Sequence, residues 1–144
     1  MQTDSPAAVY RQHMVQGQPC IRLDTDHGDS ALVALHGAQV LSWTVAGRER
    51  LYLSPRALFD GRSAIRGGIP LCFPQFNQRG PLPKHGFARN LAWQPLPTGD
   101  GHEARSSVCL QLTDSDATRS GWPERFAARL TVTLSAGSLR VQLD

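Results

Sequence analysis

Apolar and polar residues alternate over several short stretches of this 144-residue chain. The clearest stretch is 126–134, in which every second residue is apolar and mostly polar residues lie between. Because successive side chains of a strand point to opposite faces, this period of two predicts a strand with one buried face. A glycine-containing turn at 135–138 joins it to a returning strand that begins at Leu139. Further strands are predicted at 21–23, 31–35, 40–45, 51–53, 91–94 and 108–112.

No stretch shows a sustained apolar repeat with the 3.6-residue period of a helix, so the chain is predicted to be nearly all-β. Short strands at regular spacing favour an antiparallel β-sandwich or a barrel. Residues 1–19 are weakly patterned and are predicted to form an N-terminal arm, and residues 20–144 form one β domain. Since a domain seldom ends within a hairpin arm, we expect this domain to be truncated at its C-terminus. Polar connections rich in turn residues are predicted at 95–103 and 114–122.

The segment 62–93 departs from this pattern, and we predict that it carries the functional site. It contains four prolines together with glycines, aromatic residues and cations. Proline lacks an amide donor and fixes φ, so a segment this rich in proline does not form ordinary strands or helices. A long loop with its own dense chemistry is more often functional than a simple connection.

The composition excludes several classes of protein. With 40% apolar and 19% charged residues the chain matches an ordinary globular domain, and no apolar run approaches the roughly 20 residues of a membrane span. The N-terminus has no hydrophobic secretory signal, and the three cysteines are far apart and odd in number, which indicates reduced thiols in a cytoplasmic protein. Metal-ligand spacing and phosphate-loop motifs are absent from the sequence, so neither a metal nor a cofactor is predicted.

Positive charge is concentrated around the same segment. Residues 48–89 contain eight arginine or lysine side chains and two acidic ones, although the net charge of the whole chain is only +3. This asymmetry favours an anionic partner. Alternating arginines and aromatic rings would also permit stacking on single-stranded nucleic acid, which is a weaker interpretation because of the many prolines.

Arg66, Lys84 and Arg89 are the candidate anion-binding residues. The guanidinium group suits bidentate contact with phosphate or carboxylate, and the two glycines after Arg66 would let a ligand approach the backbone closely. Solvated surface charge, or an ion pair with Asp60, is the alternative. His85 lies among these cations, and a neutral imidazole can bind a sugar oxygen or transfer a proton, although a lone histidine is more often structural. Four aromatic residues would stack on a sugar face or pack in the core: Phe73, Phe76, Phe87 and Trp93.

Two motifs in this segment resemble those of the aldose 1-epimerase (galactose mutarotase-like) superfamily. They are RGGIP at 66–70, followed by Phe73-Pro74, and KHGFARN at 84–90, followed by Trp93. The similarity is greatest to the hexose-6-phosphate mutarotase branch, also called glucose-6-phosphate 1-epimerase. The resemblance implies that the chain forms the N-terminal half of a galactose mutarotase-like β-supersandwich.

The resemblance also implies an isomerase that interconverts the α and β anomers of a hexose 6-phosphate. A general acid and a general base would open and re-close the sugar ring without a cofactor. Arg66 and Arg89 match arginines that contact the anionic substrate in this family, and His85 matches a histidine that lines the pocket. Lys84 takes a substrate-contacting position that is commonly Gln or Ser. The family's general-acid histidine and general-base glutamate would lie beyond residues 1–144, so no catalytic pair is expected within this chain.

A non-catalytic carbohydrate- or sugar-phosphate-binding β domain is the alternative function, and a measurement of anomer exchange would distinguish the two. Neither a nucleic acid nor a membrane is an expected partner. Half of a β-supersandwich would leave sheet edges exposed, and these edges would permit self-association.

Overall fold

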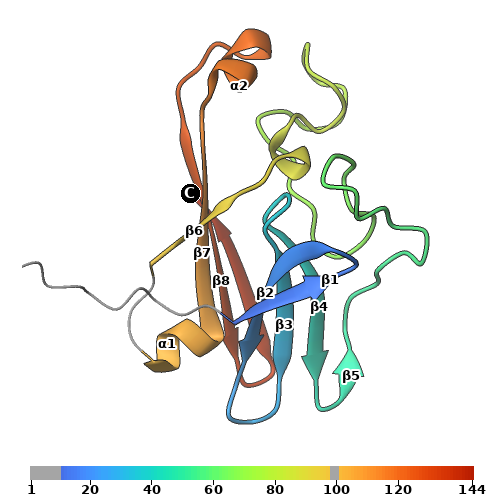
Figure 1. Ribbon diagram of the computed structural model, residues 1–144, viewed down its shortest axis with the longest axis vertical. Helices are drawn as coiled ribbons and strands as arrows, with labels where there is room; N and C mark the ends of the chain where they lie inside the picture. Colours follow the sequence, from blue (N-terminus) through green and yellow to red (C-terminus); the bar gives the residue numbers. More distant parts are fainter. Residues whose placement is uncertain (1–10, 98–100) are drawn as a thin grey trace, which may run out of the picture.

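The computed structural model describes residues 11–97 and 101–144, which form two antiparallel sheets (Figure 1). The five-stranded sheet has the order β1 (Gln12–Val15), β2 (Gln18–Asp24), β3 (Ser30–Ala34), β4 (Gln39–Val45), β5 (Arg48–Glu49). The four-stranded sheet has the order β6 (Gln94–Leu96), β7 (Ser107–Thr113), β8 (Ala127–Ser135), β9 (Ser138–Leu143). Within each sheet of the described ranges, consecutive strands pair in an antiparallel manner. This confirms the predicted all-β, antiparallel class.

One hydrophobic core lies between the two sheets. Ile21 and Leu23 of β2 belong to the same buried cluster as Leu110 of β7 and Leu130 of β8. The alternation predicted for 126–134 is confirmed, because the apolar residues of β8 point into this core. Full burial of such a side chain contributes about 1.5–3 kcal/mol, so the paired faces of the two sheets provide most of the stability of the sandwich.

A second, smaller cluster lies on the other side of the five-stranded sheet. A register shift between Leu32 and Val33 leaves Leu41 as an extra residue in β4, so that Val40 faces the central core and Leu41 faces outward. Burial in this cluster raises the pKa of the Cys20 thiol to about 11, which keeps it protonated. The segment after β5 covers the cluster and is thereby held against the outer side of β4 (Figure 1). Its covering residues are Leu53, Ala57, Phe59 and Ile65.

Short helices interrupt the predicted connections. They are the 3-10 helix η1 (Ala88–Asn90) and the α-helices α1 (Gly101–Ser106) and α2 (Asp116–Gly121). A capping box begins α2: the Ser115 hydroxyl accepts a hydrogen bond from the Thr118 amide at 3.2 Å, and the Thr118 hydroxyl accepts one from the Ser115 amide at 2.9 Å. Six residues are too few to display a helical period, so the alternation pattern could not reveal these helices. No helix within the described ranges is long and apolar enough to cross a membrane.

Two predicted strands near the central segment are wrong. The Glu49 carboxylate accepts hydrogen bonds from the amides of Trp43 (2.9 Å) and Leu51 (3.0 Å), so a side chain takes the place of the next ladder partner and 51–53 is not a strand. The amide of Trp93 donates to the Leu35 carbonyl at 2.8 Å, which draws residues 91–93 toward the turn after β3. The strand predicted at 91–94 therefore begins only at the residue after Trp93.

The predicted N-terminal arm, 1–19, is partly a strand. Residues 1–10 lie outside the described residues, but β1 and the first two residues of β2 fall within the arm. The exposed residues of β1 pair with β2 in register, with His13 opposite Cys20. The mixed apolar and polar sequence of β1 gave no period of two, because its side chains are almost all at the surface.

Candidate functional site

The four residues predicted to bind an anionic sugar line one pocket. Arg66, Lys84, His85 and Arg89 border a cavity of about 610 Å³ on the segment between β5 and β6. Pockets of about 300–1,000 Å³ are typical of small-molecule sites. The structure thus brings two motifs that are separated in sequence to one place. The other lining residues are Arg56, Leu58, Ser63, Ala64, Ile65, Gly67, Pro70 and Asn90.

The pocket carries uncompensated positive charge. Its lining contains three arginines and one lysine but no aspartate or glutamate. In the described ranges, the salt bridges involve arginines outside this pocket. None of the salt bridges in the described part of the chain joins these cations to Asp60, whose carboxylate accepts hydrogen bonds from the amides of Ser63 (2.7 Å) and Arg62 (2.8 Å). A concentration of like charge without carboxylate partners attracts anions.

Gln39 fixes the backbone on both sides of Arg66. The side chain of this buried β4 residue donates from Nε2 to the carbonyl oxygens of Ile65 (2.7 Å) and Gly67 (2.5 Å). The carbonyl of Arg66 itself accepts a hydrogen bond from the Ser54 amide at 3.0 Å. Three consecutive carbonyl groups of an irregular segment are therefore satisfied, which restricts the direction in which the Arg66 side chain leaves the backbone.

Two further side chains hold the start of this segment. His36, which is buried after β3, donates from Nε2 to the Ser63 carbonyl at 2.9 Å, so this histidine has a structural role. Asn90 of η1 donates from Nδ2 to the Arg62 carbonyl at 2.9 Å. The hydrogen bonds from the Ser63 and Arg62 amides lower the pKa of Asp60 to about 2, so its turn is held by an ionised carboxylate.

The glycines of the first motif are required by the path of the backbone. Gly67 and Gly68 have positive φ values of 119° and 60°. A Cβ atom at Gly68 would overlap the Val40 carbonyl of β4, and one at Gly67 would lie 2.5 Å from the Tyr52 carbonyl oxygen. The sequence predicted that these glycines would give a ligand access to the backbone. The structure gives a different reason for them: without a Cβ atom, the segment can lie directly against neighbouring backbone.

His85 is oriented by Asn77. Its amide donates to the Asn77 carbonyl at 3.0 Å, and its ring Nδ1 accepts from the Asn77 amide at 2.9 Å. Partial burial, followed by the positive charges of Arg89 and Lys84, lowers the pKa of His85 below its ordinary value of 6.5. The ring is therefore neutral at pH 7, and since Nδ1 is an acceptor, the proton is on Nε2. His85 offers the pocket one N–H donor.

Arg89 and Lys84 are linked through the backbone. The Nη2 atom of Arg89 donates to the Lys84 carbonyl at 3.1 Å, which anchors one side of the guanidinium group. Arg89 belongs to η1, and the amide of the neighbouring Ala88 donates to the Phe73 carbonyl at 3.1 Å. The guanidinium group retains further N–H donors for a bound anion.

Three of the four candidate stacking residues pack inside the protein. Trp93 is buried, and its indole nitrogen donates to the Ala88 carbonyl at 3.0 Å. Phe73 and Phe87 form an aromatic cluster with Trp122 and Phe126, with ring centroids 5.3–6.3 Å apart. Only Phe76 is free to meet a ligand among these four: it is 62% exposed, and its ring centroid lies 5.4 Å from that of His85.

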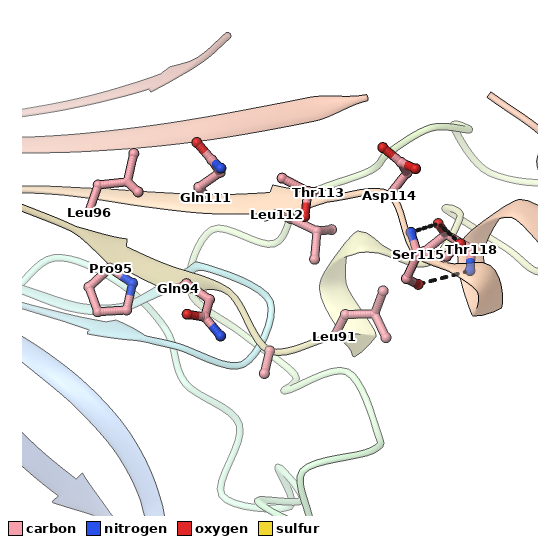
Figure 2. Close-up of a pocket in the computed structure, with 11 residues that line it drawn as sticks. Leu91, Gln94, Pro95, Leu96, Gln111, Leu112, Thr113, Asp114, Ser115 and Thr118 are labelled. Atoms are coloured by element: carbon pink, nitrogen blue, oxygen red, sulfur yellow. Dashed lines mark hydrogen bonds between the residues drawn. The ribbon is translucent and has the colours of Figure 1, made fainter. Parts of the chain in front are cut away.

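A second cavity, of about 490 Å³, lies between β6, β7 and the start of α2. Figure 2 shows Gln94 and Leu91 on one side of it and the end of β7 on the other, with Ser115 and Thr118 hydrogen-bonded to each other. Asp114 is its one charged lining residue, and this carboxylate already pairs with Arg119. The cavity offers no free cation and is a weaker candidate for binding an anionic sugar.

The sequence profile of the aldose 1-epimerase family matches residues 19–144. The chain belongs to the aldose 1-epimerase family. This membership confirms the resemblance inferred from the two motifs. Among the residues that the structure describes, no three His, Cys, Asp or Glu side chains are grouped so that they could hold a metal ion.

Relatives of this aldose 1-epimerase family member include two proteins that carry the provisional name glucose-6-phosphate 1-epimerase. The protein from Escherichia coli (strain K12) is 46% identical over 102 residues, and the protein from Cenchrus ciliaris is 42% identical over 111 residues. These alignments cover 67% and 72% of this chain, respectively, but 33% of each relative.

Solved structures agree with the fold. A provisionally named mutarotase from Salmonella typhimurium is 32% identical with a TM-score of 0.78, and the Slr1438 protein from Synechocystis sp. PCC 6803 is 26% identical with a TM-score of 0.72. The matches cover 99% of this chain and 48% or 50% of the solved chains. This chain thus has a galactose mutarotase-like fold and spans about half the length of these solved proteins.

Several residues of the site were not found from the sequence. Arg56 lines the pocket as a fourth cation, and Ser63 borders it without belonging to either motif. Asn90 ends the KHGFARN motif but was not predicted to be a site residue. Arg56 lies within the cationic segment, which was the available signal for it. The role of Gln39 had no such signal, because a single glutamine in a strand does not indicate which carbonyl groups it will meet.

Proposed function

We propose that this chain supplies the substrate-binding part of a hexose-6-phosphate mutarotase, or glucose-6-phosphate 1-epimerase, which interconverts the α and β anomers of the sugar. The carrying observation is the pocket that collects Arg66, Lys84, His85 and Arg89 without a single acidic lining residue. With Arg56, the lining contains four cations, which a neutral sugar would leave without a partner and which the charge of a sugar phosphate would compensate. The family membership and the names of the relatives support the same substrate class.

Arg66 and Arg89 would bind the phosphate group. A guanidinium group forms two parallel hydrogen bonds to phosphate oxygens, and charge assistance makes such bonds about twice as strong as neutral ones. Arg89 has one anchored nitrogen, so part of the conformational entropy of its side chain is already lost before binding, whereas for Arg66 the backbone is held in place. Lys84 would add a point charge beside them.

His85 would donate its Nε2 proton to a sugar oxygen. Ring opening requires that the C1 hydroxyl loses a proton and the ring oxygen gains one, after which the bond between C1 and the ring oxygen breaks. Rotation of the resulting aldehyde and ring closure in the reverse sense give the other anomer. With Nδ1 engaged by Asn77, neutral His85 has no lone pair free to take the hydroxyl proton. Its role is that of a donor.

A general base is missing from the pocket as far as the described residues define it. No carboxylate lines the cavity. The alternative function is a sugar-phosphate-binding β domain that does not catalyse anomer exchange. Both functions use the same anion site and differ in the proton transfer.

Two-dimensional exchange NMR on glucose 6-phosphate in the presence of the purified chain tests this proposal. We expect broadening of the ³¹P resonance, which reports binding, without faster exchange between the anomers. Faster exchange would show that the chain contains a complete acid–base pair, and would contradict the donor-only role of His85. Absence of broadening at saturating protein would overturn the sugar-phosphate site itself. The anomeric ¹H resonances, which both sugars have, allow unphosphorylated glucose to serve as the control.

A further inference from the structure

The two outer edges of the four-stranded sheet have different chemistry. β6 is three residues long and contains Pro95, and Pro97 follows it. Since proline has no amide donor, this edge is poorly suited to accept another strand. β9 is six residues long, contains no proline and alternates apolar with polar residues. Only β9 therefore offers a regular edge for pairing in this sheet.

The backbone register shows which groups of β9 face outward. Arg129 and Asp144 exchange both of their backbone hydrogen bonds, each at 2.9 Å. In an antiparallel pair such exchanging residues alternate with pairs whose amide and carbonyl groups point away from each other. The groups of Leu139, Val141 and Leu143 thus point to the outer edge of β9. No strand of the described ranges pairs with that edge.

We infer that this edge binds a second copy of the chain through antiparallel pairing of β9 with β9, centred on Gln142. This two-fold arrangement places Val141 opposite Leu143 of the partner subunit and forms four backbone hydrogen bonds. It also places Arg140 opposite Asp144 of the partner subunit, and the symmetry repeats both pairs. Leu143, which is 43% exposed in the isolated chain, becomes covered.

Charge complementarity selects this register. On the outer face of the sheet, Gln111, Arg129 and Asp144 lie in a row across β7, β8 and the end of β9, and Arg129 Nε donates to Gln111 Oε1 at 3.1 Å. The proposed pairing adds Arg140 of the partner subunit to this row, so Asp144 lies between two cations. A register centred on Val141 instead would form six backbone hydrogen bonds and not four, but it would place Arg140 opposite Gln142 of the partner subunit and pair no charges. Opposite charges directly across a strand pair are stabilising, whereas like charges are destabilising.

Sedimentation velocity over a range of protein concentrations tests the inference. The chain should form dimers as its concentration rises, and added salt should weaken them because the ion pairs are at the surface. Arg140→Asp should give a monomer under conditions in which the unchanged chain is dimeric, since two carboxylates would then face each other. Asp144→Arg should do the same by placing arginines opposite each other. The double variant, Arg140→Asp with Asp144→Arg, should restore the dimer.

Arg125→Asp is the matched control, because Arg125 is exposed, lies outside β9 and gives the same change in net charge. It should leave the dimer intact. A second variant, Val141→Pro, removes an outward-facing amide while β9 keeps its bonds to β8, and should also give a monomer. The inference fails if the chain is monomeric at every concentration. The outer edge of β9 would then pair, if at all, with a strand of a different polypeptide. It also fails if the single charge reversals leave the dimer unchanged, or if the double variant stays monomeric while circular dichroism shows that it is folded.

Discussion

Gln39 donates from one side-chain nitrogen to the two carbonyl groups that flank Arg66. This relationship connects the middle of a core strand with a residue of the candidate anion site. Gln39 is completely buried, and its Oε1 atom has no hydrogen-bond partner in the described part of the protein. A buried glutamine with an unsatisfied oxygen is costly, so its two donated bonds must compensate for it.

Replacing Gln39 with leucine should lower both stability and affinity. Loss of the donor leaves the buried Ile65 carbonyl unsatisfied, at about 1–3 kcal/mol, and removes a partner from the part-buried Gly67 carbonyl at a smaller cost. Affinity for glucose 6-phosphate should also fall, because the backbone that carries Arg66 is then no longer held by Gln39 and the position of its side chain becomes less defined. Denaturant unfolding and calorimetric titration measure the two effects. Gln78→Leu, at an exposed position, is the control and should change neither quantity. Full affinity in a folded Gln39→Leu variant would show that Arg66 needs no such support.

Replacing Arg89 with alanine should weaken binding of the phosphorylated sugar selectively. Hydrogen bonds to charged groups are worth about 1.5–3 kcal/mol, so affinity for glucose 6-phosphate should fall by roughly 10- to 100-fold. Binding of glucose should change little, because it lacks the phosphate. Titrations of both ligands with Arg89→Ala, Arg66→Ala and the control Arg79→Ala, which lies outside the cavity lining, make the comparison. Equal losses for both sugars would show that the arginines do not bind phosphate.

The sequence predicted the elements that are governed by a simple repeat. β8 is the best example, because each inward residue meets a core and each outward residue meets solvent. It also predicted that Arg66 and Arg89 belong to one site, through motifs whose residues stay near each other in the family. The helix α2 could have been found from Ser115 and Thr118, whose hydroxyl groups form its capping box, but no apolar period accompanied them.

Other features depend on contacts between distant segments and could not be predicted. The extra residue Leu41 in β4 turns two adjacent apolar side chains to opposite faces, which no alternation rule anticipates. The bond from His36 to the Ser63 carbonyl spans 27 residues. The reason for Gly68 lies in the carbonyl of Val40 and not in a ligand. Each of these contacts depends on how the strands and the segment after β5 pack on one another, which the local sequence does not specify.

The stability of the protein should depend on the protonation of His85. Its pKa in the folded protein is below the ordinary value of 6.5, so at mildly acidic pH the unfolded chain binds this proton more readily than the folded one. The free energy of unfolding should therefore be independent of this group above pH 6.5 and decrease as pH falls from 6.5 through the lowered pKa. Protonation turns Nδ1 into a donor and breaks its bond with the Asn77 amide.

Urea unfolding between pH 5 and pH 8 measures this dependence. The difference between the unchanged chain and His85→Gln isolates the contribution of one histidine from those of the others. His27→Gln, at an exposed turn residue, is the control and should keep the decrease. A decrease that persists unchanged in His85→Gln would assign it to another group.

Gly68→Ala and Gly137→Ala should differ greatly in their effect on stability, although both glycines have positive φ values, 60° and 67°. The left-handed conformation costs an alanine about 1–2 kcal/mol at either position. A Cβ atom at Gly137 meets no atom within 4 Å, whereas one at Gly68 overlaps the Val40 carbonyl in β4. Gly68→Ala must therefore move the segment away from the strand, which also disturbs the bonds from Gln39. Thermal and denaturant unfolding should show a small loss for Gly137→Ala and a loss larger by several kcal/mol for Gly68→Ala. Equal losses would mean that φ alone accounts for this glycine and that the close approach of the segment to β4 is not required.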